Sequence, residues 1–340
     1  MMAARFEFAG ALFAAAVALS AAPASAQTKP NDRVIFALPV QAVSYSYGYI
    51  AKAKGYWKDV GLDVEMPLIA GNGAPNAMLA GQADFAAGTG NSLLLARAQG
   101  QKITAAFAPF QRMGLQLVVS KNLVKDAGSI KDMSMTDRAK LLKGKTVAID
   151  RPNASPHAFS RYILQEAGLD PERDVTFVPV DAPAMPTALA AGRVDAFVMS
   201  APWPSVAVAN GKGVVLVDPL GGDLPEFYPM AYNVVMTRQG YCEQNESICK
   251  RFILGLQKAV NLMRDDLDAA ADAIAPVFER MDRKLIKDAL QDLQKSVPDK
   301  YEIDDEKMAR MQRFIAATGR PEVARLTSFE GFYTNGYLMK

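Results

Sequence analysis

The sequence predicts an α/β protein with two lobes, each a mixed sheet flanked by helices, a hinge of two extended strands and a helical C-terminal region. Three observations support this fold class. Short apolar β-rich runs alternate with helical patterns from residue 34 onward, the alternation restarts after the polar stretch 121–135, and the pattern is almost wholly helical from residue 248. Alternation of this kind favours sheets covered by helices, so each run indicates one lobe.

The first run of alternation contains five predicted strands and three predicted helices. Gly55, Gly81 and Gly100 follow the helices, and glycine at such a position ends a helix because it accepts the left-handed conformation. Strands are predicted at 34–38, 62–68, 84–87, 103–108 and 115–120, and helices at 44–54, 75–80 and 92–99.

The second run and the C-terminal region follow the same rules. Gly168 and Gly192 end the helices of the second run. Extended connections between the lobes are expected near 115–121 and 232–238. Strands are predicted at 146–149, 174–180, 195–199, 214–217 and 232–237, and helices at 156–167, 186–191, 248–264, 267–280, 283–296 and 305–318.

An internal repeat supports two related lobes. Residues 78–85 and 189–196 each combine the end of a short helix, a glycine, and an aspartate that opens an apolar strand. The aspartates, Asp84 and Asp195, can accept backbone N–H groups in the tight turn. Any helix-to-strand turn in an α/β protein can look like this, but the length of the match favours a true repeat.

The first 26 residues are expected to be a cleavable signal peptide, with the mature protein beginning near Gln27. Arg5 precedes an uncharged apolar run, 8–22, and Ala24-x-Ala26 supplies the small residues that a signal peptidase needs. The alternative, a membrane anchor, is disfavoured because the run is shorter than the ~20 apolar residues of a span. No cysteine near the cleavage site could carry a lipid, so we expect an exported protein without a lipid anchor.

Composition and motifs exclude several function classes. The formal net charge is +2, and charged residues make up 22% of the chain with both signs mixed, unlike the basic patch of a nucleic-acid-binding protein. The sequence contains no glycine-rich phosphate loop, HExxH, GxSxG or paired-carboxylate spacing. We therefore predict no catalytic residues, no cofactor, no metal site and no nucleic-acid partner.

The two cysteines, Cys242 and Cys249, lie close together in a polar stretch. In an oxidising compartment they are expected to form one local disulfide that staples a turn before a helix. Free thiols or a metal pair are the alternatives, although two thiols without nearby histidines make a poor metal site.

Four segments carry a resemblance to a known family. The chain resembles the type II periplasmic solute-binding proteins of ABC importers, in the branch that includes the taurine, alkanesulfonate and nitrate binding proteins and the pyrimidine-precursor group. The resemblance covers roughly residues 34–237. Its carriers are YIAKAKGYW at 49–57 with GLDV at 61–64, LAGQADF at 79–85, LKGKTVA at 142–148 and ALAAGRVDAF at 188–197.

The resemblance implies a fold, a mechanism and partners. Residues 27–118 and 238–340 would form lobe 1, and residues 119–237 lobe 2. A ligand would enter the cleft between them, the lobes would close about the hinge, and the closed form would dock on a permease and ATPase complex. The protein would act as a monomer, without chemistry of its own. Lacking an anchor, it would be retained only in a Gram-negative periplasm.

Ligands of open α/β sheets lie beyond the carboxyl ends of strands, and this rule selects the candidate binding residues. Ala201 stands where the family commonly has a glutamate, so the resemblance does not transfer a ligand identity. Arg112 and Arg151 could pair with a sulfonate or carboxylate, but exposed arginines usually have no such role. The predicted ligand-binding residues are Gln41, Tyr45, Thr89, Asn91, Ser92, Gln111, Asn153, Ser155, His157, Asp181 and Trp203.

These candidates have competing structural explanations. Residues 89–92 and 153–155 stand at helix starts, where free N–H groups favour an anionic group, but simple N-capping explains them equally well. Tyr45 and Trp203 could stack on a planar ligand, although aromatic residues more often fill cores. His157, the only histidine, cannot build a metal site or a triad by itself.

Two other functions share this fold. One is an enzyme similar to the pyrimidine synthase of thiamine biosynthesis, but that type carries a cysteine-rich motif that this chain lacks. The other is a ligand-sensing module for a sensor kinase, which the sequence does not distinguish from an importer component.

Overall fold

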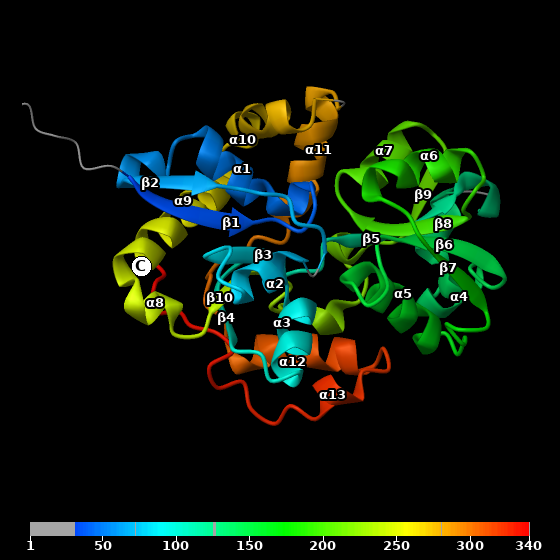
Figure 1. Cartoon of the computed structure of the whole chain (residues 1–340). Helices are drawn as coiled ribbons and strands as arrows, with labels where there is room; N and C mark the ends of the chain where they lie inside the picture. The colour runs from blue at the N-terminus through cyan, green and yellow to red at the C-terminus, as the bar shows by residue number, and fades with distance from the viewer. Residues whose placement is uncertain (1–30, 72, 125–126, 280, 340) are drawn as a thin grey trace, which may run out of the picture. The chain divides into compact units, whose positions relative to one another are not determined.

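Two five-stranded mixed sheets form the centre of the computed structural model, which describes residues 31–71, 73–124, 127–279 and 281–339 (Figure 1). The predicted signal peptide, residues 1–26, lies outside the described residues. Within the described residues, none of the helices combines the length and the apolar character that a membrane crossing requires.

The first sheet has the strand order β2-β1-β3-β10-β4, and we call the part of the structure built on it the first lobe. Strands β1, β2 and β3 run parallel, whereas β10 runs antiparallel to both β3 and β4. The strands are β1 (Asp32–Ala37), β2 (Leu62–Glu65), β3 (Phe85–Thr89), β4 (Ile103–Phe110) and β10 (Asn233–Arg238).

The second sheet repeats this plan in the order β7-β6-β8-β5-β9, and the part built on it is the second lobe. Strand β6 pairs parallel with β7 and β8, and β5 runs antiparallel to β8 and β9. In both sheets the strand that follows a crossing between the lobes takes the fourth place. The strands are β5 (Leu115–Ser120), β6 (Lys145–Ile149), β7 (Val175–Pro179), β8 (Ala196–Ser200) and β9 (Gly213–Val217).

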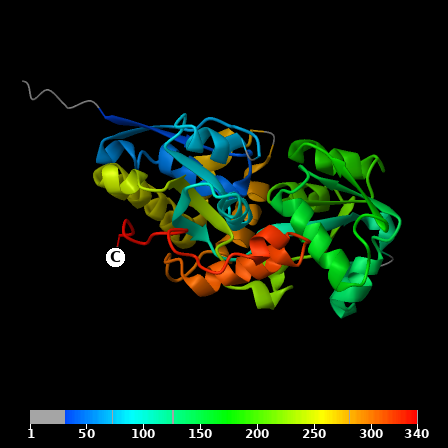
Figure 2. The same ribbon diagram turned by 60° about the horizontal axis from the view of Figure 1, so that its bottom comes forward.

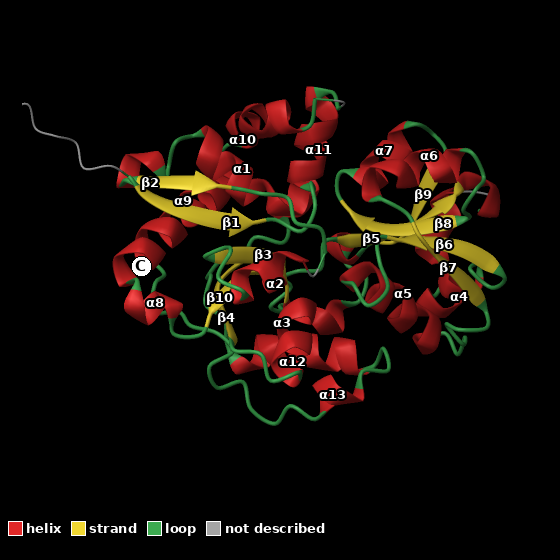
Figure 3. Ribbon diagram, viewed as in Figure 1, coloured by secondary structure: helices red, strands yellow, loops and turns green. Residues whose placement is uncertain are grey.

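The helices flank both sheets, as Figure 3 shows by the red ribbons around the two yellow groups. They confirm the predicted α/β architecture with a helical C-terminal region. The helices are α1 (Ser46–Ala53), α2 (Gly73–Leu79), α3 (Gly90–Ala98), α4 (Met135–Lys140), α5 (Ser155–Glu166), α6 (Met185–Ala190), α7 (Trp203–Ala209), α8 (Tyr241–Gln244), α9 (Glu246–Asp265), α10 (Leu267–Ile274), α11 (Arg283–Gln294), α12 (Asp305–Ala316) and α13 (Pro321–Ala324).

The repeated aspartates have equivalent roles in the two lobes. Asp84 Oδ2 accepts the backbone N–H of Ile35 at 2.8 Å, and Asp195 Oδ2 accepts that of Thr146 at 2.9 Å. Each carboxylate therefore binds the strand in the second place of its own sheet, β1 or β6, rather than the turn in which the sequence placed the bond. The match between the two sites supports the predicted relation between the lobes.

The chain crosses between the sheets twice, through residues 111–114 into β5 and through residues 218–232 into β10. Strand β5 belongs wholly to the second sheet and β10 wholly to the first. The lobe limits predicted from the sequence, at 118/119 and 237/238, fall within these two strands and stay a prediction as domain boundaries.

Alternate residues of β1 face different cores, because successive side chains of a strand point to opposite sides. Val34 and Phe36 belong to the core that includes α9, α10 and α11, whereas Ala37 belongs to the core that includes α2, α3 and α12. Both faces of the first sheet are thus covered by helices. Figure 2 brings α12 and α13 (orange to red) forward; both pack against α3.

An aromatic cluster joins the first sheet to α9. Phe252 of α9 stacks on Phe85 with ring centroids 4.0 Å apart and on Trp57 with centroids 5.2 Å apart. Its ring also meets the edge of Phe36 at 5.3 Å, and Trp57 Nε1 donates to the Phe252 carbonyl at 2.9 Å. Such pairs contribute about 0.5–1.5 kcal/mol beyond their buried area, so this cluster stabilises the docking of α9.

The sequence missed short helices where local patterns were weak. Helix α7 lies between the predicted strands 195–199 and 214–217, where no helix was predicted, and α4 begins at the last residue of the polar stretch 121–135. The valines of α7 have low helix propensity, but Pro204 in its first turn and packing against β8 and β9 favour the helix. Predicted strand 62–68 ends early, at Glu65, before Pro67.

The predicted disulfide is confirmed. Cys242 of α8 and Cys249 of α9 are bonded, with their Cα atoms 5.6 Å apart, and both are buried. The bond holds the turn before α9, as the sequence indicated.

Removing this disulfide by the double substitution Cys242→Ala, Cys249→Ala should lower the free energy of unfolding by about 2 kcal/mol, because a short closed loop restricts the unfolded chain. Urea unfolding with and without a reductant measures the effect. The reductant should destabilise the native protein by a similar amount and leave the double variant unchanged. A double variant as stable as the oxidised native protein would contradict the prediction.

Candidate ligand-binding site

A cavity of about 370 Å³ lies where the carboxyl ends of strands from the two lobes meet. In the first lobe it is lined by the loops after β1 and β2, the end of β3 and the start of α3, and in the second lobe by the segments after β6 and β7 and the end of β8. The start of β10 completes the wall. This is the position that α/β sheets give to ligands, because neighbouring parallel strands leave a crevice at their carboxyl ends.

On the first-lobe side, the cavity wall is the start of α3. Ser92 Oγ accepts the backbone N–H of Thr89 at 3.1 Å, and Thr89 Oγ1 accepts that of Ser92 at 3.5 Å, so the two residues form a capping box. Ser92 Oγ also donates to the Thr89 carbonyl at 2.7 Å. N-capping therefore explains the hydroxyl groups of Thr89 and Ser92, which belong to the predicted site.

On the second-lobe side, the wall is the start of α5. Its N-cap residue, Ala154, has no side-chain oxygen, so the first N–H groups of this helix are not capped by that side chain. Asn153, just before it, has a φ of 67°, and its N–H donates to His157 Nδ1 at 3.0 Å. The helix thus presents its positive end to the cavity, where Ser155 and Pro156 lie.

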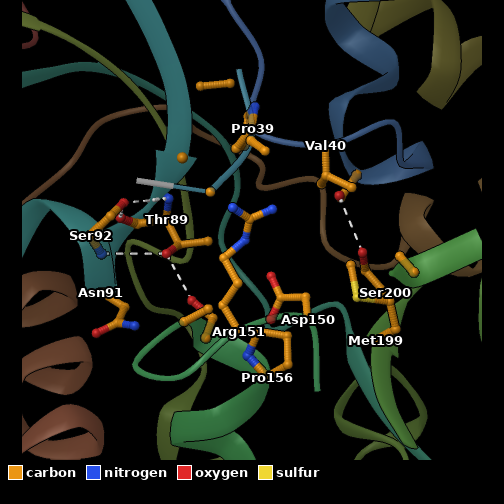
Figure 4. Close-up of a pocket in the computed structure, with 18 of the residues that line it drawn as sticks. Pro39, Val40, Thr89, Asn91, Ser92, Asp150, Arg151, Pro156, Met199 and Ser200 are labelled. Carbon is orange, nitrogen blue, oxygen red and sulfur yellow. Dashed lines mark hydrogen bonds between the residues drawn. The ribbon is translucent and has the colours of Figure 1, made fainter. Parts of the chain in front are cut away.

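Hydrogen bonds join the lobes around the cavity. Thr89 Oγ1 and Ser155 Oγ are 2.8 Å apart, and Asn91 Nδ2 donates to the Asn153 carbonyl at 3.4 Å. Figure 4 shows Thr89 and Ser200 on opposite sides of Arg151.

Around Ser200, further contacts join the two lobes. Ser200 Oγ lies 3.4 Å from Ser44 Oγ, and Val43 N–H donates to the Ala201 carbonyl at 3.1 Å. Ala201 stands where the resemblance expects a glutamate, and it therefore contributes its backbone carbonyl to this contact between the lobes.

Arg151 extends from its strand end into the cavity, between Thr89 and Asp150 (Figure 4). It comes from the second lobe but lies against Gly71 of the first. A Cβ at Gly71 would be only 2.8 Å from Arg151 Nε, and Gly71 has a φ of +57°, so glycine is required there. Among the described residues, Arg151 has no ion-pair partner. Its guanidinium therefore remains available to a ligand.

Asp150 is one of two carboxylates in the cavity lining, the other being Asp181. Asp150 Oδ1 is buried and has no hydrogen-bond partner among the described residues. Burial raises the pKa of Asp150, although the neighbouring Arg151 partly opposes this. Burial also raises the pKa of Tyr45 and of Tyr232, and in both cases the nearby Asp150 adds to the rise. Two tyrosines and this carboxylate thus lie close together.

The structure gathers seven of the eleven predicted ligand-binding residues around this cavity. Their contact with a ligand stays a prediction. They are Tyr45, Thr89, Asn91, Ser92, Asn153, Ser155 and Asp181.

The other four lie outside the lining of this cavity. The Gln41 side chain donates to the Val277 carbonyl. Gln111 is only 1% exposed, and its Nε2 donates to two carbonyls of the C-terminal region, Lys300 at 3.2 Å and Glu302 at 3.3 Å. Both glutamines are therefore held by tertiary contacts.

Trp203 and His157 also lie outside the lining of this cavity. Trp203 begins α7, and its buried Nε1 has no partner among the described residues. His157 lines a neighbouring, more polar cavity of about 230 Å³ with Arg161, Glu172 and Arg320. Burial lowers its pKa, and the nearby Arg161 adds to this effect.

The predicted ligand-binding residues leave out several polar residues of the wall. Asp150 and Arg151 directly follow β6, in the same loop as Asn153; the sequence suggested Arg151 as a partner for an anion, but neither residue was included in the predicted set. Ser44 and Ser200 lie beside predicted residues. Tyr232 and Asn233 had no such cue, because they stand at the beginning of an antiparallel strand; Asn233 Oδ1 accepts the Tyr47 hydroxyl at 2.8 Å.

Comparison with known proteins agrees with this architecture. The chain is 23% identical over 271 residues to YtlA of Bacillus subtilis (strain 168), which is named as a binding protein, with 78% of this chain and 76% of that protein covered. It is 27% identical over 250 residues to a second protein of that organism, whose name assigns it aliphatic sulfonates, with 71% and 69% covered.

A solved structure shows the same fold. The periplasmic aliphatic sulphonate binding protein SsuA from Escherichia coli matches with a TM-score of 0.67 and 19% identity, covering 88% of this chain and 95% of that one. The two lobes therefore have the type II periplasmic binding protein fold. Residues 40–277 match the NMT1-like family, which spans both lobes and the cavity between them. The chain belongs to the NMT1-like family.

Proposed function

We propose that this protein is the solute-binding component of an ABC-type importer, and that it carries a small organic ligand with an anionic group. It would work as a monomer in the periplasm and deliver the ligand to a permease and ATPase complex. The observation that carries the proposal is the cavity between the lobes, lined from both sides at the carboxyl ends of the strands. Family membership and the sulfonate-binding relatives support it.

The size and lining of the cavity favour an organic ligand. A volume of about 370 Å³ lies within the usual range for small-molecule sites and far exceeds the needs of an inorganic ion such as nitrate. Much of the wall is apolar, with Val40, Leu68, Leu95, Leu115 and Met199 among its residues. An organic body would bury these side chains from water, and Tyr45 and Tyr232 would suit a planar one.

Two features favour an anionic group on that body. The start of α5, with no capping side chain at Ala154, offers backbone N–H groups and the positive end of a twelve-residue helix. Arg151 adds the only cationic side chain among the described residues that line the cavity. A sulfonate or carboxylate could accept hydrogen bonds from both, and such charge-assisted bonds are about twice as strong as neutral ones.

We expect the purified mature protein to bind one small organic molecule without converting it. Native mass spectrometry of the intact protein should show one bound mass, which mild denaturation releases. The released compound, returned to emptied protein, should raise the melting temperature and be recovered unchanged. The exposed surface variant Val208→Ser is the control and should behave as the native protein does. Chemical turnover of the compound would overturn the binding-only function.

A further inference from the structure

A second polar cavity, the one of about 230 Å³ that His157 lines, is built from both lobes. It shares Asn91 and Asn153 with the lining of the ligand cavity. The second lobe contributes His157 and Arg161 of α5 to its wall. Residues 318–320 complete it; they lie between α12 and α13, which pack against α3 of the first lobe. Separation of the lobes would therefore take apart this second cavity together with the first.

The imidazole of His157 is neutral in this cavity. Its Nδ1 accepts the backbone N–H of Asn153 at 3.0 Å, so this nitrogen carries no proton of its own. A protonated ring has an N–H at both nitrogens, and it would lose this hydrogen bond. The ring also packs edge-on against Phe177, with centroids 4.7 Å apart.

The hydrogen bond to His157 holds the backbone on which the lobes meet. Asn153 has a φ of 67°, a conformation that few residues other than glycine adopt, and its N–H bond to the imidazole fixes it. The carbonyl of the same residue accepts Asn91 Nδ2 of the first lobe at 3.4 Å. Two residues later, Ser155 Oγ lies 2.8 Å from Thr89 Oγ1.

The groups around His157 favour its neutral form. Burial has the largest effect and lowers the pKa of His157; Arg161 and Arg320 lower it further, whereas Glu172 opposes them. Arg161 pairs with Glu172, and its Nε donates to the Thr318 carbonyl at 3.1 Å, which is a further contact between α5 and the C-terminal region.

Part of this environment exists only while the lobes are together. Arg161 and Glu172 belong to the second lobe and would move with His157. The segment 318–320 belongs to the first-lobe side, and Arg320 is held there near Glu322, at 3.6 Å. Opening would expose the imidazole and remove the charge of Arg320, so the pKa of His157 would rise toward the value of about 6.5 for a free imidazole.

We propose that His157 couples closure of the lobes to proton binding, so that the closed form needs a neutral imidazole and acidification favours opening and ligand release. This inference rests on the proposed function and adds a regulation to its site. Linkage is reciprocal, so closure weakens proton binding by the same factor by which a bound proton disfavours closure. The closed form is fully favoured above the pKa of the open form. It loses this advantage as the pH falls toward the lower pKa of the closed form, by at most about tenfold per pH unit.

A covalent lock on the lobes provides the closed form without a ligand. The double variant Ser44→Cys, Ser200→Cys should form a disulfide between the lobes, because the two hydroxyl oxygens that the sulfurs replace are 3.4 Å apart. Neither serine is among the described residues that line the second cavity. The reference is the emptied native protein, in which the open form can be populated. Small-angle X-ray scattering should give the locked protein the smaller radius of gyration.

Proton NMR then measures the pKa of His157 in both samples. His157 is the only histidine of the chain, so a protein without a histidine tag gives a single imidazole signal. The pKa should be lower in the locked protein, and each unit of difference corresponds to about a tenfold change in the closing equilibrium. Within the locked protein, Arg320→Gln should raise the pKa of His157. The matched control Arg313→Gln, at an exposed arginine of α12, should leave it unchanged.

Three outcomes would overturn the inference. They are equal pKa values in the locked and unlocked proteins, a pKa that Arg320→Gln does not change, and equal radii of gyration, since nothing then opens. If the first cross-link does not form, Thr89→Cys, Ser155→Cys replaces it, at oxygens 2.8 Å apart.

The proposed function is tested separately, because none of these measurements uses a ligand. A protein that retains no small molecule in native mass spectrometry would contradict the proposed function and the inference that rests on it. A retained molecule together with equal pKa values would overturn the inference alone.

Discussion

Replacing Trp57 with alanine should lower the free energy of unfolding by about 3–5 kcal/mol, the usual cost of deleting a large buried aromatic side chain. Trp57 is 2% exposed, stacks on Phe252 and donates its Nε1 hydrogen to the Phe252 carbonyl. It also lies directly on the backbone of α9: a Cβ at Gly255 would be 2.3 Å from Trp57 Cδ1. Because Gly255 has no side chain, nothing on that side can fill the space.

Urea unfolding followed by circular dichroism measures this loss. Trp57→Phe should lower the free energy of unfolding by less, because it keeps an aromatic ring in the cluster. Its remaining cost comes from the smaller ring and from the lost hydrogen bond to the Phe252 carbonyl. Val208→Ala, at a position 45% exposed on α7, should change stability by no more than about 0.5 kcal/mol. A loss below about 1 kcal/mol for Trp57→Ala would show that this cluster does not hold α9 to the first sheet.

Replacing Arg151 with alanine should weaken ligand binding by about tenfold to a hundredfold, since a hydrogen bond to a charged group contributes about 1.5–3 kcal/mol. The melting temperature of the empty protein should hardly change, because Arg151 is exposed and has no ion-pair partner among the described residues. Isothermal titration with the compound released from the native protein measures the affinity.

Two further variants show whether a loss of affinity in Arg151→Ala is specific to this arginine and to its planar donor group. Arg151→Lys keeps the charge but not the planar donor group, so its affinity should fall between those of the native protein and Arg151→Ala. Arg33→Ala removes an exposed arginine that pairs with Glu65 at the edge of the first sheet and should leave binding unchanged. Equal affinity in the native protein and Arg151→Ala would place the anionic group elsewhere in the cavity.

The fold could be predicted because its elements have strong local patterns. Strand β5 has the predicted limits, and α9 differs from its prediction by two residues at the start and one at the end. Glycines predicted the helix ends well, because few other residues accept a positive φ. Gly81 and Gly192, which both follow predicted helices, have positive φ angles in the structure. Helix α7 was not predicted because its local pattern is weak. Its packing against β8 and β9 outweighs the low helix propensity of its valines.

The site was predictable in place but not in detail. Strand ends identify the loops that meet at a cleft, and this rule found both Thr89 and Ser155. It does not say which way a side chain points. Gln111 follows a strand end, yet its amide binds carbonyls 189 and 191 positions away in the sequence. Partners so distant leave no local pattern, so such a residue cannot be told from a ligand contact by spacing alone.

The hydrogen bonds between the lobes have a consequence for the rate of binding. Thr89 with Ser155 and Ser44 with Ser200 join the lobes around the cavity, so a ligand that enters must first separate such contacts. Association then depends on how often the lobes part, and the observed rate levels off as ligand concentration rises. The same contacts would slow escape, so a captured molecule would leave on the timescale of lobe opening.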